Sequence, residues 1–434
     1  MMSPLQQLHG KARDTIRGGL LAAMSRRGDV TGVLLDPRMA IDPYPAYDWL
    51  RERGPLVPSN LGPMTTTHEL VNALLRHPAV VSANARREEL MLASMPPGMR
   101  WLFRGPDRTG VVDPLGAESM IGMDGPEHAR LRTLVSSVFT PARVERLRPR
   151  LEEIAEELLD AAGGQGDVDV MHVLAGPLPV RAICEVLGVP PSDAERFRRW
   201  GRAGAVDLDS MAPAHEQHAA TQALVELEAY FDRLISEREH TGGDDILSAL
   251  IEAESEGGRL NRRELITMAV LLLFAGFETT VNLIGNGTAA LLAHPEQAQD
   301  LRADPSLVPG AVEEMLRYDT PVQVVARIAT RELRLGGAQV PAGEMISLLL
   351  GAANRDPAVF DDPHRFDIHR PNARRHLSFA AGPHHCLGAS LARLEAQVAF
   401  AALLRRGVPR PAGEAVRRRT YILRGFERLP VALG

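Results

Sequence analysis

Lysine is almost absent from this sequence. Of the 434 residues only Lys11 is a lysine, although lysine and arginine together number 49. This excludes the chemistries that depend on a lysine, including the lysine of a phosphate-binding loop, a Schiff base and a kinase-type catalytic lysine. Nearly all positive charge is therefore arginine, whose planar and permanently charged guanidinium suits the binding of carboxylates and phosphates.

Cysteine and long apolar runs are also scarce. Cys184 and Cys386 are the only cysteines, which excludes a disulfide framework and fits a reducing cytosol. The longest apolar run, Ala269–Phe277, stops at Glu278 and is too short to cross a bilayer. The run Gly18–Met24 is too short for the apolar core of a signal peptide. We therefore expect a cytoplasmic protein without a membrane partner.

Neither sign of charge dominates. The 49 basic and 55 acidic residues give a net charge of −6, so nothing indicates nucleic acid as a partner. The 45% of hydrophobic residues suffice for a large core. No repeat or low-complexity linker divides the chain. We expect residues 1–30 to form a loosely ordered N-terminal extension and residues 31–434 to form a single domain.

Helical periodicity dominates after residue 30. The expected helices are residues 45–53, 68–76, 126–139, 141–162, 173–187, 192–201, 215–239, 244–254, 261–293, 295–303, 307–318 and 387–404. The expected strands are short and comprise residues 56–58, 64–66, 325–329, 333–335 and 345–350. The predicted fold class is therefore mainly α with a minor β region.

One predicted helix, Asn261–Ala293, is unusually long. Asn261 and Glu264 form a capping-box pattern at its start, and its length of roughly 50 Å would cross a whole domain. Its apolar middle is followed by Ala-Gly-Phe-Glu-Thr-Thr, residues 275–280. An acid and two hydroxyls inside a buried helix are costly unless they are paired or functional. This segment alone supports a kink with local hydrogen bonds as well as it supports a functional site.

Cys386 lies in Phe-Ala-Ala-Gly-Pro-His-His-Cys-Leu-Gly, residues 379–388, directly before a predicted helix. A helix N-terminus stabilises a thiolate, and the glycines permit the backbone to approach a flat group closely. A zinc site would need more ligands at recognisable spacing, and a Cys–His nucleophile would need an oxyanion-hole motif. An inert buried cysteine and a single axial thiolate to haem iron both remain open on these residues alone.

Five motifs, in one order along the chain, resemble those of the cytochrome P450 family. Residues 379–388 resemble its haem-binding loop, and Glu314-Met-Leu-Arg317 resembles its Glu-x-x-Arg helix. Arg370 falls where the family places the third member of that ion-pair triad. Residues 275–280 resemble the oxygen-activating segment, and His128-Ala-Arg-Leu-Arg132 resembles the haem-propionate helix. The chain is therefore identified as a member of this family.

The resemblance implies the cytochrome P450 fold, with haem b between the long central helix and the Cys loop. Cys386 would be the axial ligand of the haem iron, because an electron-rich sulfur favours O–O cleavage. The other implied haem-binding residues are Phe379, Gly382, Gly388, Ala275 and Gly276 and, around the propionates, His128, Arg132, Arg327 and His384. Ala380 departs from the glycine usual in the family, which puts the fine geometry of the loop in doubt but not the ligation.

The resemblance also assigns catalytic and structural roles. Thr279 would hold a water and donate a hydrogen bond to bound dioxygen, and Glu278 would relay protons. Glu314, Arg317 and Arg370 would form buried structural ion pairs that support the Cys loop. Cys184 is expected to be an ordinary buried helix cysteine.

The implied function is a monooxygenase that inserts one oxygen atom of O2 into a hydrophobic small molecule by hydroxylation or epoxidation. Ferredoxin and ferredoxin reductase would supply the electrons, with Arg374, Arg375 and Arg393 as candidate docking residues. The arginine-rich composition favours secondary-metabolite tailoring. The segments expected to line the substrate site are residues 91–115, 200–211, 271–275 and 322–325. The alternatives are a haem-thiolate enzyme that uses peroxide or performs oxidative coupling without oxygen insertion, and a haem protein without turnover.

Overall fold

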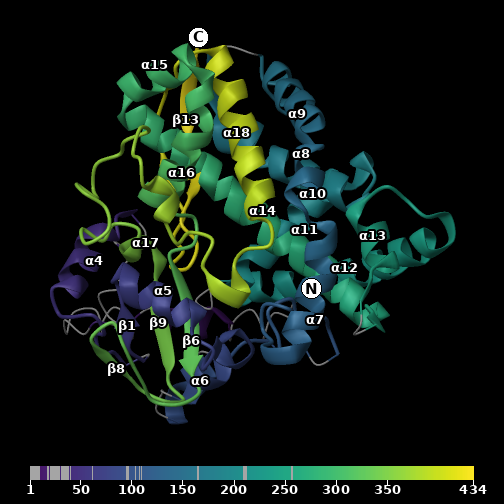
Figure 1. The fold of residues 1–434 in the computed structure, drawn as a ribbon. Helices are drawn as coiled ribbons and strands as arrows, with labels where there is room; N and C mark the ends of the chain where they lie inside the picture. Colours follow the sequence, from purple (N-terminus) through teal and green to yellow (C-terminus); the bar gives the residue numbers. More distant parts are fainter. Residues whose placement is uncertain are drawn as a thin grey trace.

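The structure is a computed structural model and describes residues 10–16, 19, 30, 39, 41–60, 62–93, 97–102, 104–106, 108, 110–163, 166–208, 213–255 and 258–434. Most of these residues are helical, and small sheets lie beside and below the helices (Figure 1). The predicted fold class, mainly α with a minor β region, is confirmed.

Helices of very different length make up most of the described chain. The first half contains α4 (Tyr44–Arg51), α5 (His68–Arg76), α6 (Arg87–Ala93), α7 (Gly125–Val138), α8 (Pro141–Glu145), α9 (Arg148–Ala161), α10 (Pro177–Leu187), α11 (Ala194–Leu208) and α12 (Ala214–Thr241). The second half contains α13 (Ile246–Glu252), α14 (Arg262–Ala293), α15 (Pro295–Ala303), α16 (Val308–Tyr318), α17 (Leu350–Ala353) and α18 (Ala389–Arg406).

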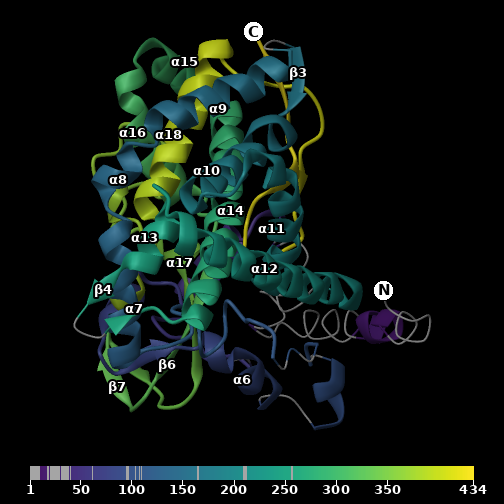
Figure 2. The same cartoon turned by 90° about the vertical axis from the view of Figure 1, so that its right-hand side faces the viewer.

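Helix α14 runs through the middle of the molecule (Figures 1 and 2). Its predicted capping box is present, because the Asn261 side chain accepts from the Glu264 N–H at 2.9 Å and the Glu264 carboxylate accepts from the Asn261 N–H at 2.8 Å. The helix is long and apolar enough to cross a membrane, but 83% of its most apolar stretch is buried inside the protein. It is therefore the central core helix.

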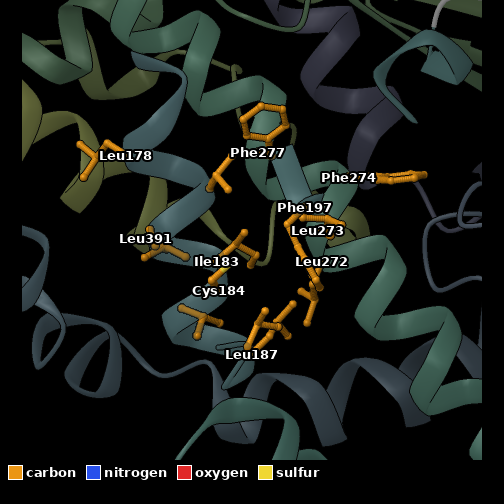
Figure 3. Packing of buried hydrophobic residues seen from close by; sticks show 14 of the residues in the cluster. Leu178, Ile183, Cys184, Leu187, Phe197, Leu272, Leu273, Phe274, Phe277 and Leu391 are labelled. Carbon is orange, nitrogen blue, oxygen red and sulfur yellow. The ribbon is translucent and has the colours of Figure 1, made fainter. Parts of the chain in front are cut away.

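Helices α10, α11, α14 and α18 share the largest hydrophobic cluster, part of which Figure 3 shows. Two glycines of α11 allow close packing on α14: a Cβ at Gly201 would collide with the Phe277 ring, and one at Gly204 would collide with the Phe274 ring. Cys184 on α10 is buried in this cluster. Burial raises the pKa of its thiol to about 12, so Cys184 is the ordinary core cysteine that we expected.

The strands form small sheets that join distant parts of the sequence. In the largest, β1 (Met64–Thr65) pairs parallel to β9 (Met345–Leu349), and β9, β6 (Val324–Ala329) and β2 (Val80–Ser82) follow in antiparallel order. The remaining strands are β3 (Gly166–Asp169), β4 (Glu254–Ser255), β5 (Gly258–Arg259), β7 (Leu333–Leu335), β8 (Ala338–Val340), β10 (Arg410–Pro411), β11 (Val416–Arg417), β12 (Phe426–Arg428) and β13 (Pro430–Leu433).

Two predicted helices are interrupted, and proline explains both breaks. The single helix expected over residues 141–162 divides into α8 and α9 because Pro149 cannot occupy a helix interior, where its ring would clash with the preceding turn. The helix expected over residues 173–187 is likewise divided, into a π-helical turn at Met171–Ala175 and α10, which begins at Pro177.

The predicted N-terminal extension lies mostly outside the described residues. Its described part includes a helical segment, residues 10–16. Arg13 donates hydrogen bonds to the Arg104 carbonyl at 3.0 Å and to the Gln217 side chain at 3.2 Å. This segment therefore contacts the start of α12. The division at residue 30 stays a prediction.

Candidate active site

The Cys loop leads into α18 and is held by its own backbone. The Cys386 N–H donates to the Phe379 carbonyl at 2.9 Å. Gly382 has a left-handed φ of 69°, and a Cβ there would collide with the Leu75 carbonyl of α5. Gly382 thus lets the loop close onto α5, and its contact with the haem stays a prediction. At Gly388 an added Cβ would meet no atom within 4 Å.

Cys386 is an exposed residue although protein atoms crowd its thiol. Burial raises the pKa of the thiol, whereas a hydrogen bond from the Gly388 backbone and the charges of Arg132 and Arg393 lower it. A cysteine in such a place presents one sulfur, with cations nearby to stabilise its thiolate.

A stripe of accessible residues interrupts the buried surface of α14. Ala275 is exposed, and Gly276 and Thr279 are half-buried, while Phe277 and Glu278 between them are buried. The Thr279 hydroxyl donates to the Ala275 carbonyl at 2.8 Å. Helix α14 packs against α18, which follows Cys386 (Figures 1 and 2). The stripe and the thiol therefore lie on neighbouring elements.

Glu278 has partners that the sequence did not reveal. It is fully buried and forms an ion pair with Arg418. Burial raises the pKa of Glu278, and the charges of Arg418 and Arg202 oppose this shift. The only local hint was the run of three arginines at 417–419.

The residues expected around the propionates come together from three elements. The His128 ring of α7 lies 4.3 Å from the His384 ring of the Cys loop, and His384 Nε2 lies 2.8 Å from an Asp124 carboxylate oxygen. Burial and the nearby His384 lower the pKa of His128 to about 4, so His128 is neutral at pH 7. Asp124, which the sequence analysis missed, also accepts from the Ser82 N–H at 2.8 Å.

Two arginines of this set have no carboxylate partner among the described residues. Arg327 on β6 is buried and donates to the Ala326 carbonyl; burial lowers its pKa and the charge of Asp124 raises it. Burial also lowers the pKa of Arg132 on α7, and the charge of the nearby Cys386 raises it. Arginine guanidinium groups bind carboxylates well, and the binding of a ligand carboxylate by these two residues stays a prediction.

Glu314, Arg317 and Arg370 form a connected buried ion-pair group. Arg317 donates to both Glu314 carboxylate oxygens at 2.7 and 2.8 Å, and Arg370 Nε lies 3.2 Å from Glu314 Oε2. Neither Glu314 nor Arg317 is exposed to solvent. Arg317 also donates to the backbone carbonyls of Asn354, Pro363 and Arg365, which fixes the segment before the Cys loop.

A second buried acid, Glu313, was missed. It accepts from Arg393 at 2.6 and 3.0 Å and from His376 at 3.1 Å. Arg393 also lies over the Phe379 ring, 4.4 Å from its centroid. These contacts give Arg393 a structural role, and its role in docking stays a prediction. Arg374 and Arg375 are exposed.

The segments expected to line the substrate site are described only in part. Phe103 lies outside the described residues, as do residues 209–211. Trp101 is 53% exposed. Phe274 packs on Gly204 of α11. Their contribution to a substrate site stays a prediction.

Comparison with known proteins places these features in a family. The Cytochrome P450 family model matches residues 299–407, which include the Glu314 ion pairs and the Cys loop. The chain is 41% identical to 6-deoxyerythronolide B hydroxylase of Saccharopolyspora erythraea over 409 residues, 91% of this chain and 96% of that protein. It is also 41% identical to the cytochrome P450 monooxygenase PikC of Streptomyces venezuelae, over 90% of this chain and 91% of that protein. The chain belongs to the cytochrome P450 family.

Solved P450 structures share the fold. P450BioI, crystallised with an acyl carrier protein that bears hexadec-9Z-enoic acid, aligns with a TM-score of 0.82 and 34% identity over 92% of this chain and all of that one. PksS of Bacillus subtilis aligns with a TM-score of 0.80. Family membership makes this P450 an oxidoreductase of the monooxygenase type and implies a haem-thiolate cofactor.

Proposed function

We infer that this P450 is an O2-dependent monooxygenase that hydroxylates or epoxidises a hydrophobic small molecule in secondary metabolism. The exposed Cys386 at the start of α18 carries this proposal. The similarity of the chain to 6-deoxyerythronolide B hydroxylase, PikC and the polyketide-biosynthesis P450 PksS supports a tailoring role.

The described residues fit haem b. Cys386 offers the one soft ligand that the iron needs, and Gly388 leaves open space beside it. Arg132 and Arg327 have no carboxylate partner among the described residues and would bind the propionates, with His128 and His384 next to them. Ala275 and Gly276 would keep α14 thin over the ring, while Phe379 and Gly382 shape the loop.

Bound haem b supplies the iron that activates O2 for insertion of one oxygen atom. The remaining chemistry belongs to two side chains of α14. The Thr279 hydroxyl, now bonded to the Ala275 carbonyl, would turn to hold a water and donate a hydrogen bond. Glu278 would supply protons from the buried side of the helix. The presence of both groups favours use of O2 over the alternative peroxide reaction.

Electrons would come from a ferredoxin and its reductase in the cytoplasm. The exposed Arg374 and Arg375 would attract an acidic ferredoxin, whereas Arg393 is engaged with Glu313. This docking would weaken as ionic strength rises. Salt-independent electron transfer would contradict it.

Thiolate ligation is tested by the spectrum of the reduced, carbon-monoxide-bound protein. The wild type should show the red-shifted Soret band of a haem-thiolate. Cys386→Ala should lose this band, and Cys184→Ala, the matched control in the core, should keep it. A Cys386→Ala protein that kept the band would overturn the assignment. A spin-shift screen for substrates, followed by incorporation of labelled O2, then separates oxygen insertion from oxidative coupling.

A further inference from the structure

Glu278 is sealed from solvent and has one ion-pair partner among the described residues. It is fully buried, and that partner is Arg418. No other described group donates a hydrogen bond to either carboxylate oxygen. Removal of one partner from a buried ion pair leaves a charge that the protein interior disfavours strongly. The protonation state of Glu278 therefore depends on Arg418.

Arg418 reaches Glu278 from a C-terminal hairpin that lies against α14. Its backbone N–H donates to the Gly425 carbonyl and its Nε donates to the Phe426 carbonyl, both at 3.2 Å. A Cβ at Gly425 would collide with Asn282, which is one helical turn beyond Glu278. The close passage at Gly425 thus fixes the position from which the guanidinium approaches the acid.

The guanidinium connects the buried acid with the outside. The Arg418 side chain is 26% exposed, whereas that of Glu278 is not exposed at all. A second cation, Arg202 of α11, acts on the same acid: burial raises the pKa of Glu278, and Arg418 and then Arg202 lower it. Arg202 follows Gly201, whose contact with Phe277 places α11 directly beside this turn of α14.

We propose that Arg418 is a positioning residue for proton delivery, which holds Glu278 as a carboxylate at neutral pH and connects it to solvent. A proton would pass from solvent along the Arg418 side chain, whose guanidinium keeps its own protons, to the Glu278 carboxylate, and from its carboxyl group to the water held by Thr279. Loss of the Arg418 charge would leave Glu278 protonated at neutral pH, and its carboxyl group would release a proton to the water held by Thr279 less readily. The inference rests on the proposed role of Glu278 as the relay acid.

The decisive measurement is the infrared pH titration of the Glu278 carboxyl group in the haem-loaded protein. Its protonated C=O stretch is assigned as the band that Glu278→Gln removes. In Arg418→Gln the midpoint should rise by about 1–3 pH units, because a neighbouring cation lowers a carboxyl pKa by that amount. The midpoint in Arg418→Lys should fall between those of the wild type and of Arg418→Gln. Arg419→Gln, an exposed neighbour, should titrate like the wild type.

A second readout follows proton supply itself. The solvent isotope effect on O2 consumption should be at least about twofold larger in Arg418→Gln than in the wild type and in Arg419→Gln, since the proton relay then becomes rate-limiting. Equal titration midpoints and equal isotope effects, with the thiolate band intact, would overturn the role of Arg418 alone. Absence of the thiolate band from the wild type would instead contradict the proposed function. If Arg418→Gln does not fold, Arg202→Gln should shift the midpoint in the same direction by less, and no shift would overturn the inference.

Discussion

The Arg393 guanidinium binds both carboxylate oxygens of Glu313, at 2.6 and 3.0 Å. This bidentate pair connects α18, which follows Cys386, to α16. The next residue of α16, Glu314, binds Arg317 and Arg370. Two consecutive acids therefore hold the segments before and after the Cys loop, and the position of the cysteine depends on both.

Glu313→Gln should destabilise the fold by about 3 kcal/mol at pH 7. Burial alone would raise the pKa of Glu313, but hydrogen bonds from His376 and Arg393 outweigh it and lower the pKa to about 2. A depressed carboxyl pKa stabilises the folded state above the unfolded value near 4.5, and this stabilisation is lost as the pH falls towards 2. Urea denaturation should show that the unfolding free energies of the wild type and Glu313→Gln differ less at pH 3.5 than at pH 7.

Glu127, which is exposed and pairs with Arg130, provides the control. Glu127→Gln should change the unfolding free energy by less than about 1 kcal/mol at either pH. An effect of Glu313→Gln that was equally small, or independent of pH, would contradict a stabilising role for Glu313.

Ala380→Gly should stabilise the protein by about 0.5–1 kcal/mol. Ala380 has a φ of 55°, a left-handed conformation that costs an alanine about 1–2 kcal/mol and a glycine almost nothing; the entropy that glycine loses on folding offsets part of the gain. The neighbouring Ala381 is extended, with a φ of −154°, so Ala381→Gly should destabilise. Thermal and urea unfolding of both variants distinguish the two positions, and a loss of stability in Ala380→Gly would show that the backbone is not strained there.

Thr279→Val should lower product formation by about 100-fold, with the missing electrons recovered as reduced oxygen. Thr280 gives a matched control, because its hydroxyl donates to the Gly276 carbonyl at 3.1 Å just as that of Thr279 donates to Ala275. Thr280 is buried and Thr279 is accessible. Thr280→Val should therefore keep near-normal coupling of electrons to product. Equal losses in the two variants would indicate that both hydroxyls serve only the helix backbone.

Glu395→Gln should stabilise the protein at neutral pH by about 1–3 kcal/mol. Glu395 of α18 is buried, its Oε2 accepts no hydrogen bond from the part of the chain that the structure describes, and burial raises its pKa well above the usual range. A carboxyl with a raised folded-state pKa loses stability as the pH rises above its unfolded value. The gain in unfolding free energy of Glu395→Gln over the wild type should thus be small at pH 4.5 and larger at pH 8. The exposed Glu427→Gln should show no such trend, and a pH-independent gain would mean that Glu395 titrates normally.

Features encoded locally were predictable from the sequence. The long helix and its capping box depend on Asn261, Glu264 and a continuous apolar stretch, all within the segment itself. The breaks at Pro149 and Pro177 were equally local, and stricter use of proline as a helix breaker would have found them. Strands such as β10 and β11 have two residues each, too few to show an alternating pattern.

The candidate site was predicted only where a motif indicated it. The resemblance supplied Cys386, Thr279 and Glu278, but no pattern links Glu278 to Arg418 or His384 to Asp124. Each of these pairs joins parts of the chain that are more than one hundred residues apart, so only the fold brings them together. The charge state of the site depends on these long-range partners, which is why motifs alone could not give it.

The contact of Gly382 with the Leu75 carbonyl has a consequence for biosynthesis. The two residues are separated by more than two thirds of the chain, so α5 leaves the ribosome long before the loop that must close onto it. The Cys loop therefore cannot reach its final shape before both segments have been synthesised, and contacts this distant in sequence form slowly. Capture of the haem by this loop should therefore come late in folding, after α5 has formed the surface onto which the loop closes.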